Sequence, residues 1–179
     1  MANPDTRTVS VRAPEAPKGG ASIKVSSSSF KDGAAIPMEN VFTGCGGKNT
    51  SPQLSWTGAP AGTKSFAITC FDPDAPTGSG YWHWIAFDIP ASATSLDAGA
   101  GTDKSPAGGK SGLSDFGMNS YGGPCPPKND IPHRYIFTVY ALDVDSIKGA
   151  GDKTTGATLN FMMRGHCLAS GSITGTFAH

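Results

Sequence analysis

Three stretches of the chain alternate apolar and polar side chains with the two-residue period of a β-strand. The first, "FAITCF" at 66–71, predicts a strand in which Phe66, Ile68 and Cys70 share one face. Asp72 continues that row. A carboxylate is therefore expected at the end of a strand face that otherwise points into the core.

The second stretch, "YWHWIAFDIP" at 81–90, predicts a longer strand with two different faces. One predicted face carries His83, Ile85, Phe87 and Ile89. The other carries Trp82, Trp84, Ala86 and Asp88. The alternation therefore places a histidine on the more apolar side, near the start of the strand.

The third stretch, "HRYIFTVYALD" at 133–143, is apolar on both predicted faces, which is typical of a central strand. One face carries His133, Tyr135, Phe137 and Val139, and the other carries Arg134, Ile136, Thr138 and Tyr140. This strand, like the second, is expected to begin with a histidine on a core-facing row.

One helix is predicted near the C-terminus, where Leu159, Met162, Met163 and His166 recur at helical spacing. Thr154 or Thr155 is the expected N-cap, and Gly171 is expected just past the end of the helix. Alternation then returns in "SITGTF" at 172–177, which predicts a last strand. "SIKVSS" at 22–27 predicts an early one.

Composition favours a mainly β protein, because the 179 residues include 24 glycines and 14 prolines and lack long charged helical runs. The length suits one domain, expected over 21–179. The polar segment 1–20 is interpreted as a flexible N-terminal arm, in which "RTVSVR" at 7–12 alternates enough to add an edge strand.

The formal net charge is +0, and the basic residues are scattered singly, so neither nucleic acid nor an anionic membrane surface is an expected partner. No apolar run approaches the roughly 18 residues that a membrane span needs. The first 20 residues also lack the apolar core of a signal peptide. These features predict a cytoplasmic protein without stable membrane insertion.

The four cysteines, Cys45, Cys70, Cys125 and Cys167, form no CxxC pair, which disfavours a zinc ribbon or a thioredoxin-like motif. Cys45 and Cys125 both lie in glycine-rich loops and would pair if those loops met. In a cytoplasmic protein, two reduced thiols are the favoured interpretation.

Polar groups interrupt the core-facing rows of all three strands near their ends. If the strands are neighbours, Asp72, His83 and His133 meet at one rim, with the Tyr135 hydroxyl beside them. The loop "YGGPCPP" at 121–127 would offer backbone amides nearby. Two imidazoles beside a carboxylate suit a phosphate-like anion, bound modestly and in a pH-sensitive way.

These motifs resemble the phosphatidylethanolamine-binding proteins, also called Raf-kinase-inhibitor-like proteins, and most of all their bacterial and archaeal YbhB/YbcL branch. The resemblance covers about residues 22–178 and is specific through the combination of motifs. The matching segments are "NTSPQLSW" (49–56), "DPDAP" (72–76), "GYWHW" (80–84), "YGGPCPP" (121–127) and "HRYIFTVYALD" (133–143).

The resemblance implies an antiparallel β-sandwich with a C-terminal helix and a small anion pocket at one rim. Its implied ligand-binding residues are Asp72, His83, Cys125, Pro127, His133 and Tyr135. Family members are generally regarded as binding phospholipid head groups or phosphorylated groups, and some inhibit kinases or proteases. Cys125 stands where eukaryotic members usually have glycine, so a side chain narrows that edge of the pocket.

The favoured function is therefore non-enzymatic binding of a phosphate-bearing or other small anionic ligand, with no cofactor and with kinase or protease inhibition as its consequence. One alternative is a hydrolase-type enzyme, with Cys125 or a serine in 111–120 as nucleophile and His133 or His83 as base. A metal site built from Asp72, His83 and His133 is another. A homodimer is a further open alternative, since the branch includes homodimers.

Overall fold

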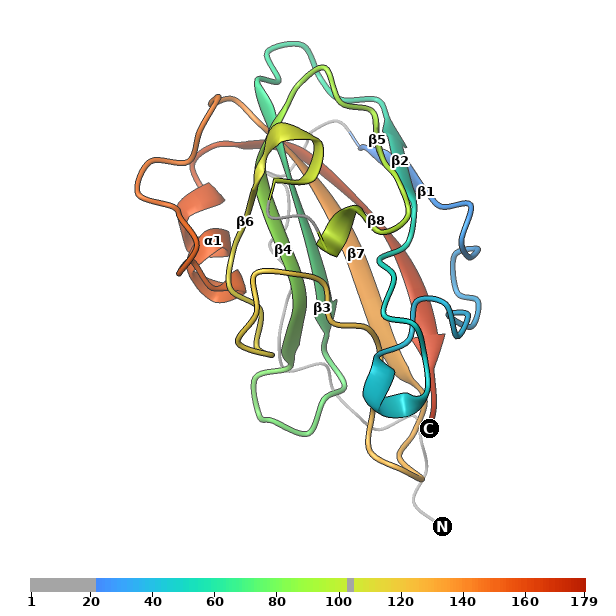
Figure 1. Ribbon diagram of the computed structural model, residues 1–179. Coiled ribbons are helices and arrows are strands. Elements are labelled where there is room, and N and C mark those ends of the chain that lie inside the picture. Colours follow the sequence, from blue (N-terminus) through green and yellow to red (C-terminus); the bar gives the residue numbers. More distant parts are fainter. Residues whose placement is uncertain (1–21, 103–104) are drawn as a thin grey trace.

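The computed structural model describes residues 22–102 and 105–179. Two antiparallel β-sheets face each other in it, and one α-helix lies on the outer side of the larger sheet (Figure 1). The predicted class, a mainly β sandwich with one helix, is confirmed. The expected arm at 1–20 and its edge strand at 7–12 lie outside the described residues.

The small sheet has the order β1-β2-β5 and the large sheet the order β6-β4-β3-β7-β8. The strands are β1 (Lys24–Ser26), β2 (Leu54–Thr57), β3 (Ser65–Asp72), β4 (Tyr81–Pro90), β5 (Ser95–Leu96), β6 (Lys110–Ser111), β7 (His133–Leu142) and β8 (Cys167–Phe177). The helices are α1 (Gly156–Met163) and three short 3₁₀ turns, η2 (Thr43–Cys45), η3 (Ala100–Thr102) and η4 (Pro106–Gly108).

The large sheet is covered on both faces, as the apolar pattern of its central strands requires. One face packs against the small sheet, where Trp56 of β2 and Phe66 of β3 meet edge to face. The other face packs under α1, whose Leu159 and Met163 are buried against it. β7 lies between β3 and β8, so the predicted central strand is confirmed.

Two β-bulges in β4 overturn the predicted faces of that strand. Cys70 pairs with Trp84 and Phe71 with Trp82, which leaves His83 as an extra residue between them. A second extra residue is Asp88, at a positive φ of 55°. The prediction of one uninterrupted alternation along β4 is therefore wrong, because each bulge reverses the order of inward and outward side chains.

The corrected faces follow from the packing. Ile85 and Phe87 lie under α1, whereas Ile89 belongs to the core between the sheets. Trp84 and Ala86, predicted on the opposite side from Ile89, share that core with it. The first bulge also turns His83 toward the inter-sheet side, away from its predicted neighbours Ile85 and Phe87.

The predicted helix is present but shorter than expected. Thr155 is its N-cap, and its hydroxyl accepts a hydrogen bond from the Thr158 amide at 3.3 Å. The helix ends at Met163, so His166 lies in the turn after it. β8 begins at Cys167, and Gly171 is therefore inside a strand that starts earlier than 172.

Gly171 allows close approach of the chain entering β1. A Cβ atom there would overlap the carbonyl oxygen of Ile23, whose amide donates to Ser170 at 3.2 Å. We expect Gly171→Ala to lower the free energy of unfolding by about 2 kcal/mol, because backbone must shift to admit the methyl group. Urea denaturation measures this loss.

Gly165→Ala is the matched control, since a Cβ atom at Gly165 meets nothing within 4 Å. Its free energy of unfolding should stay within about 0.5 kcal/mol of the wild type. Equal effects of the two substitutions would contradict the proposed overlap.

Candidate functional site

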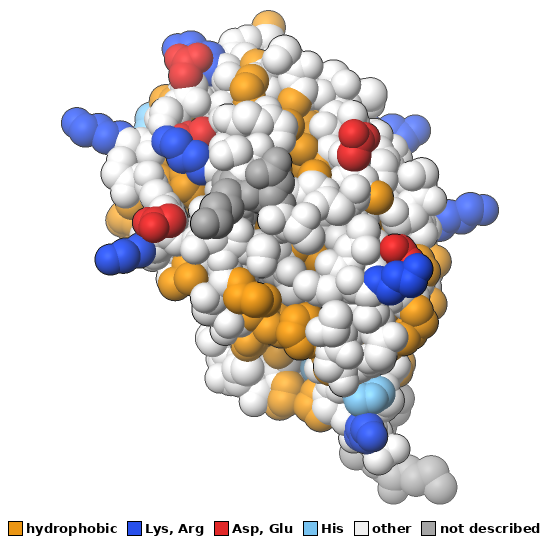
Figure 2. All heavy atoms as spheres, viewed as in Figure 1, with side chains coloured by type: hydrophobic (Ala, Val, Ile, Leu, Met, Phe, Trp, Pro, Cys, Tyr) orange, Lys and Arg blue, Asp and Glu red, His pale blue; other side chains and the backbone are white. Residues whose placement is uncertain are grey.

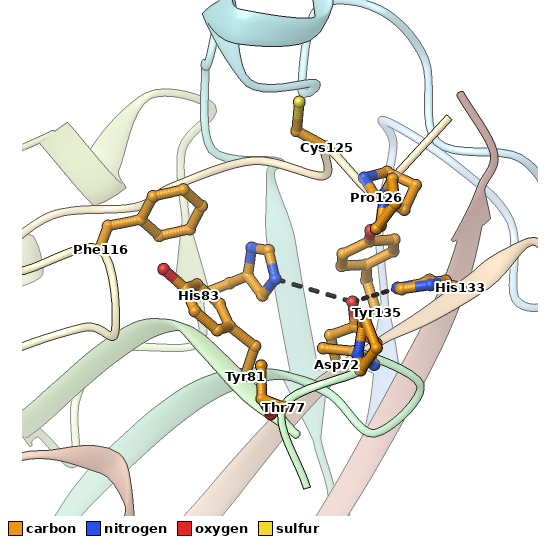
Figure 3. A pocket seen from close by; sticks show the side chains of 12 residues that line it. Asp72, Thr77, Tyr81, His83, Phe116, Cys125, Pro126, His133 and Tyr135 are labelled. Atoms are coloured by element: carbon orange, nitrogen blue, oxygen red, sulfur yellow. Dashed lines mark hydrogen bonds and ion pairs between the residues drawn. The ribbon is translucent and has the colours of Figure 1, made fainter. Parts of the chain in front are cut away.

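A pocket of about 210 Å³ opens at the end of the large sheet where β3 ends and β4 and β7 begin. All six ligand-binding residues predicted from the sequence line it. The full lining is Asp72, Ala75, Pro76, Thr77, Tyr81, His83, Phe116, Cys125, Pro126, Pro127, His133 and Tyr135 (Figure 3). The three strand ends therefore converge as expected, although the ligand-binding role of these residues stays a prediction.

A buried carboxylate joins the two histidines. The Nδ1 atom of His133 donates to Asp72 Oδ2 at 2.8 Å, and His83 Nε2 lies 4.0 Å from the same oxygen (Figure 3). The Nε2 atom of His133 lies 3.3 Å from Asp130 Oδ2. Because both ring nitrogens of His133 face carboxylate oxygens, both are donors, and the ring is held as an imidazolium.

Asp72 also builds the turn that follows β3. Its Oδ1 atom accepts hydrogen bonds from the amides of Asp74 at 2.8 Å and Ala75 at 3.0 Å. One oxygen of Asp72 therefore stabilises the turn while the other faces the histidines. A turn-forming role and a pocket role are combined in one side chain.

The same turn is clamped to the start of β7. Asp74 accepts hydrogen bonds from Arg134 Nε at 2.8 Å, Arg134 Nη2 at 2.7 Å and the Arg134 amide at 2.9 Å. The Arg134 guanidinium holds the pKa of Asp74 below its usual value although burial acts against it. The Asp74 side chain thus joins the turn to β7, and Arg134 is directed away from the pocket.

The β4 bulge positions His83. Its Nδ1 atom lies 2.7 Å from the Gly122 carbonyl oxygen, and the Gly122 amide donates back to the His83 carbonyl at 2.9 Å. Because a carbonyl only accepts, Nδ1 must carry the proton, and in the neutral ring Nε2 is an acceptor. That Nε2 atom is buried without a hydrogen-bond partner among the described residues.

The two histidines differ in protonation. Burial lowers the pKa of His83, and the nearby Asp72 offsets this only in part. Burial also acts to lower the pKa of His133, but the carboxylates of Asp72 and Asp130 outweigh it and raise that pKa. The pocket therefore combines a ring that favours its neutral form with one that favours its cation.

Tyr135 supplies a hydroxyl to the pocket floor. Burial, and next the charge of Asp72, raise the pKa of Tyr135, so the phenol keeps its proton. The hydroxyl is buried and makes no hydrogen bond of normal geometry with the described residues. It is therefore a donor available to a bound oxygen atom.

The pocket wall opposite His133 is aromatic. Tyr81 and Phe116 each lie edge to face against His83, with ring centroids 5.3 Å away, and 5.1 Å from each other. Sequence reasoning gave neither residue a role. Tyr81 stands inside the matching segment 80–84 and could have been noticed, whereas Phe116 lies in a loop without periodic signal.

Cys45 and Cys125 form a disulfide with a Cα–Cα distance of 5.5 Å, so the expectation of two reduced thiols is wrong. The two glycine-rich loops meet because the Phe42 amide donates to the Pro124 carbonyl at 3.0 Å and the Gly123 amide to Asn49 Oδ1 at 2.7 Å. Cys70 and Cys167 carry free thiols.

The metal site proposed from the sequence fits the geometry less well than the anion pocket does. Among the described residues, a single group of three or more metal-ligating side chains has all its ligand atoms within 4.8 Å, and it is not Asp72, His83 and His133. On the face seen in Figure 2, charged side chains are scattered rather than gathered into a basic patch. No helix in the described segments has the length and hydropathy of a membrane span.

Comparison with known proteins identifies the family. The family model described as phosphatidylethanolamine-binding protein (PEBP) matches residues 26–178. The chain belongs to the PEBP family. Relatives in Escherichia coli (strain K12) are YbcL, 45% identical over 86% of this chain and 86% of YbcL, and YbhB, 46% identical over 87% of this chain and 100% of YbhB.

Solved structures agree with this PEBP assignment. The crystal structure of E. coli YbcL, described as a new member of the mammalian PEBP family, matches with a TM-score of 0.84 and 44% identity, covering 89% of this chain and 99% of that one. CT736 from Chlamydia trachomatis matches with a TM-score of 0.76 and 30% identity, covering 88% and 98%. The predicted resemblance to the YbhB/YbcL branch is confirmed.

The disulfide should contribute substantially to stability. It links residues 80 apart in sequence, and chain-entropy arguments give about 4 kcal/mol for a loop of that size. We expect the double variant Cys45→Ser/Cys125→Ser to lose about this much free energy of unfolding in urea. A reductant should destabilise the wild type and Cys167→Ser alike but leave the double variant unchanged; a response of the double variant would implicate another thiol.

The buried ion pair of His133 with Asp72 should make the free energy of unfolding depend on pH. Removing one partner of a buried ion pair costs about 3 kcal/mol, so His133→Asn should lower the free energy of unfolding by about that amount at pH 6. The folded-state pKa of His133 is raised, so its contribution is fully present below the unfolded value of about 6.5 and is lost as pH rises through the folded value.

Urea denaturation between pH 6 and pH 9 measures this difference. The gap between wild type and His133→Asn should shrink as the pH rises. The exposed pair of His166 with Asp143 serves as control, and His166→Asn should show no comparable gap. A gap that stays constant over the whole range would contradict an imidazolium at His133.

Proposed function

We propose that this PEBP-family protein binds a phosphate-bearing ligand in the pocket between Asp72, His83 and His133 and leaves it chemically unchanged. The observation that carries the proposal is the buried Nε2 atom of His83, which faces the pocket without a hydrogen-bond partner among the described residues. A buried polar atom in this state is costly unless a ligand or water completes its hydrogen bonds.

The tautomer of His83 determines which ligand form is preferred. Neutral His83 accepts at Nε2, so it can bind a phosphate oxygen only if that oxygen carries a proton or if the ring takes one up. A phosphomonoester has a second pKa of about 6 and exists partly as its monoanion near neutral pH. Binding is therefore coupled to one proton and strengthens as the pH falls.

The charges around the pocket agree with a singly charged ligand. His133 is the only cationic group among its lining residues, and Asp72 and Asp130 lie against it. Asp115, which faces His83 from the neighbouring loop, adds another carboxylate. A dianion would meet too little positive charge, whereas a monoanion can accept from the Tyr135 hydroxyl and donate to His83 Nε2.

The wall of the pocket favours an organic phosphate over inorganic phosphate. Tyr81, Phe116 and Pro126 offer apolar surface beside the histidines. A volume of about 210 Å³ suits a ligand of head-group size. We therefore infer a phosphomonoester that corresponds to a phospholipid head group, such as phosphoethanolamine.

Regulation of a kinase or protease remains a proposed consequence of this binding, with occupancy of the pocket controlling the partner. Nucleic acid is not a proposed partner, and a homodimer stays an open prediction. The hydrolase alternative is less well supported, because the sulfur of Cys125 is in a disulfide and no serine of 111–120 lines the pocket.

The cytoplasmic location predicted from the sequence is not the location that we propose. Its weakest point is the Cys45–Cys125 disulfide, since such bonds persist mainly in oxidising compartments. We favour an oxidising compartment on this ground, and the redox state of the two cysteines in freshly lysed cells tests it.

Titration with phosphoethanolamine and with inorganic phosphate tests the binding proposal. We expect the ring signals of His83 and His133 to shift in NMR spectra, and the affinity to be higher at pH 6 than at pH 8. His83→Gln keeps a donor for the Gly122 carbonyl but loses the imidazole, so its affinity should fall about tenfold.

The pH dependence of binding should also weaken in His83→Gln, because the imidazole nitrogen that pairs with the proton of the bound monoanion is then missing. His166→Gln, which alters a histidine in the turn after α1, is the matched control and should bind as the wild type does. Absence of any shift at millimolar ligand would reject the pocket as a phosphate site.

A further inference from the structure

A second cluster of reactive side chains lies beside the pocket. Cys45, Cys125 and His179 bring their sulfur and ring nitrogen atoms within 4.8 Å of one another, the one group of this kind among the described residues. His179 Nδ1 is 3.2 Å from Cys45 Sγ. In Figure 3 the sulfur of Cys125 points toward η2 and away from His83 and Asp72, so this cluster adjoins the anion site and shares only Cys125 with its lining.

Backbone hydrogen bonds hold the three residues together independently of the disulfide. The loop of Cys45 is joined to that of Cys125 by the Phe42 amide, which donates to the Pro124 carbonyl at 3.0 Å. His179 follows β8, and its carbonyl accepts from the Asn129 amide at 3.1 Å. Reduction of the disulfide would therefore leave the side chains near one another.

Reduction would turn this cluster into a set of metal ligands. A dithiol reductant gives two electrons and two protons to the Cys45–Cys125 bond, which breaks into two thiols while the reductant becomes a disulfide. Two thiolates and one imidazole are a ligand set for Zn²⁺, with a fourth position left to water. Binding of Zn²⁺ displaces the two thiol protons.

The distances are compatible with such a site. With Zn–S bonds of about 2.3 Å, tetrahedral geometry needs the two sulfur atoms about 3.7 Å apart. The Cα atoms lie 5.5 Å apart, so side-chain rotation after reduction can provide this separation. Cys45 is buried, Cys125 half-buried and His179 exposed, which gives an ion a path from solvent.

We propose that the reduced protein binds one Zn²⁺ ion through Cys45 Sγ, Cys125 Sγ and His179 Nδ1. The disulfide and the metal site are then alternative states of the same two cysteines. The oxidised protein lacks both thiolates and does not bind the ion.

Titration of the reduced protein with Co²⁺, and then displacement by Zn²⁺, tests the proposal. We expect one equivalent of Co²⁺ with thiolate-to-metal charge-transfer absorption, which Zn²⁺ abolishes, and no such signal from oxidised protein. Cys45→Ser and Cys125→Ser should each remove most of the charge-transfer intensity. His179→Gln should weaken Zn²⁺ binding at least about tenfold, since even indirect partners of metal ligands have effects of that size.

Controls separate the site from other thiols and from the anion pocket. Cys167→Ser and His166→Gln should bind the ion as the wild type does. His83→Gln should also leave metal binding unchanged. A failure of the phosphate proposal can therefore be told apart from a failure of the zinc proposal. Circular dichroism confirms that each variant is folded. Absence of a charge-transfer band in reduced wild type, or equal Zn²⁺ affinity in His179→Gln, would overturn the proposal.

Discussion

The carboxylate of Asp72 is the group on which the pocket depends. It is buried at the end of β3, where an unpaired charge would be strongly unfavourable, and it is stabilised by the His133 imidazolium and by two amides of the following turn. That turn places Asp74 against Arg134 and so connects the end of β3 to the start of β7. The need to compensate the buried charge of Asp72 thus holds the end of β3 and the start of β7 in place beside the pocket.

The two histidines have different roles in this arrangement. His133 compensates the charge of Asp72 and is committed at both ring nitrogens, whereas His83 is held by a carbonyl at one nitrogen and is left open at the other. Of the two histidines, only His83 has a ring nitrogen that faces the pocket without a hydrogen-bond partner among the described residues. The functional proposal therefore assigns His133 mainly to the electrostatic balance and His83 to the ligand.

Much of the fold could be predicted from the sequence, because strand periodicity is a local property. The strands around 66–71, 81–90 and 133–143 and the two faces of β7 follow directly from alternation. The bulge at His83 could not be predicted, since an extra residue is defined only by pairing with β3. The disulfide and the contribution of Phe116 depend on loops that meet only in three dimensions. Asp72, His83 and His133 still meet, because they lie at the ends of neighbouring strands, although the predicted face of His83 in β4 is wrong.

The bulge in β4 has a consequence for how such pockets arise. Its extra residue lies between the pairs Cys70–Trp84 and Phe71–Trp82. The direction of the imidazole therefore depends on the number of residues in the strand and not on their chemical type. Deleting one position there would restore regular pleating and turn the ring toward the helix side of the sheet. Gain or loss of a single codon, with every pocket side chain retained, is thus enough to create or erase this pocket geometry during descent.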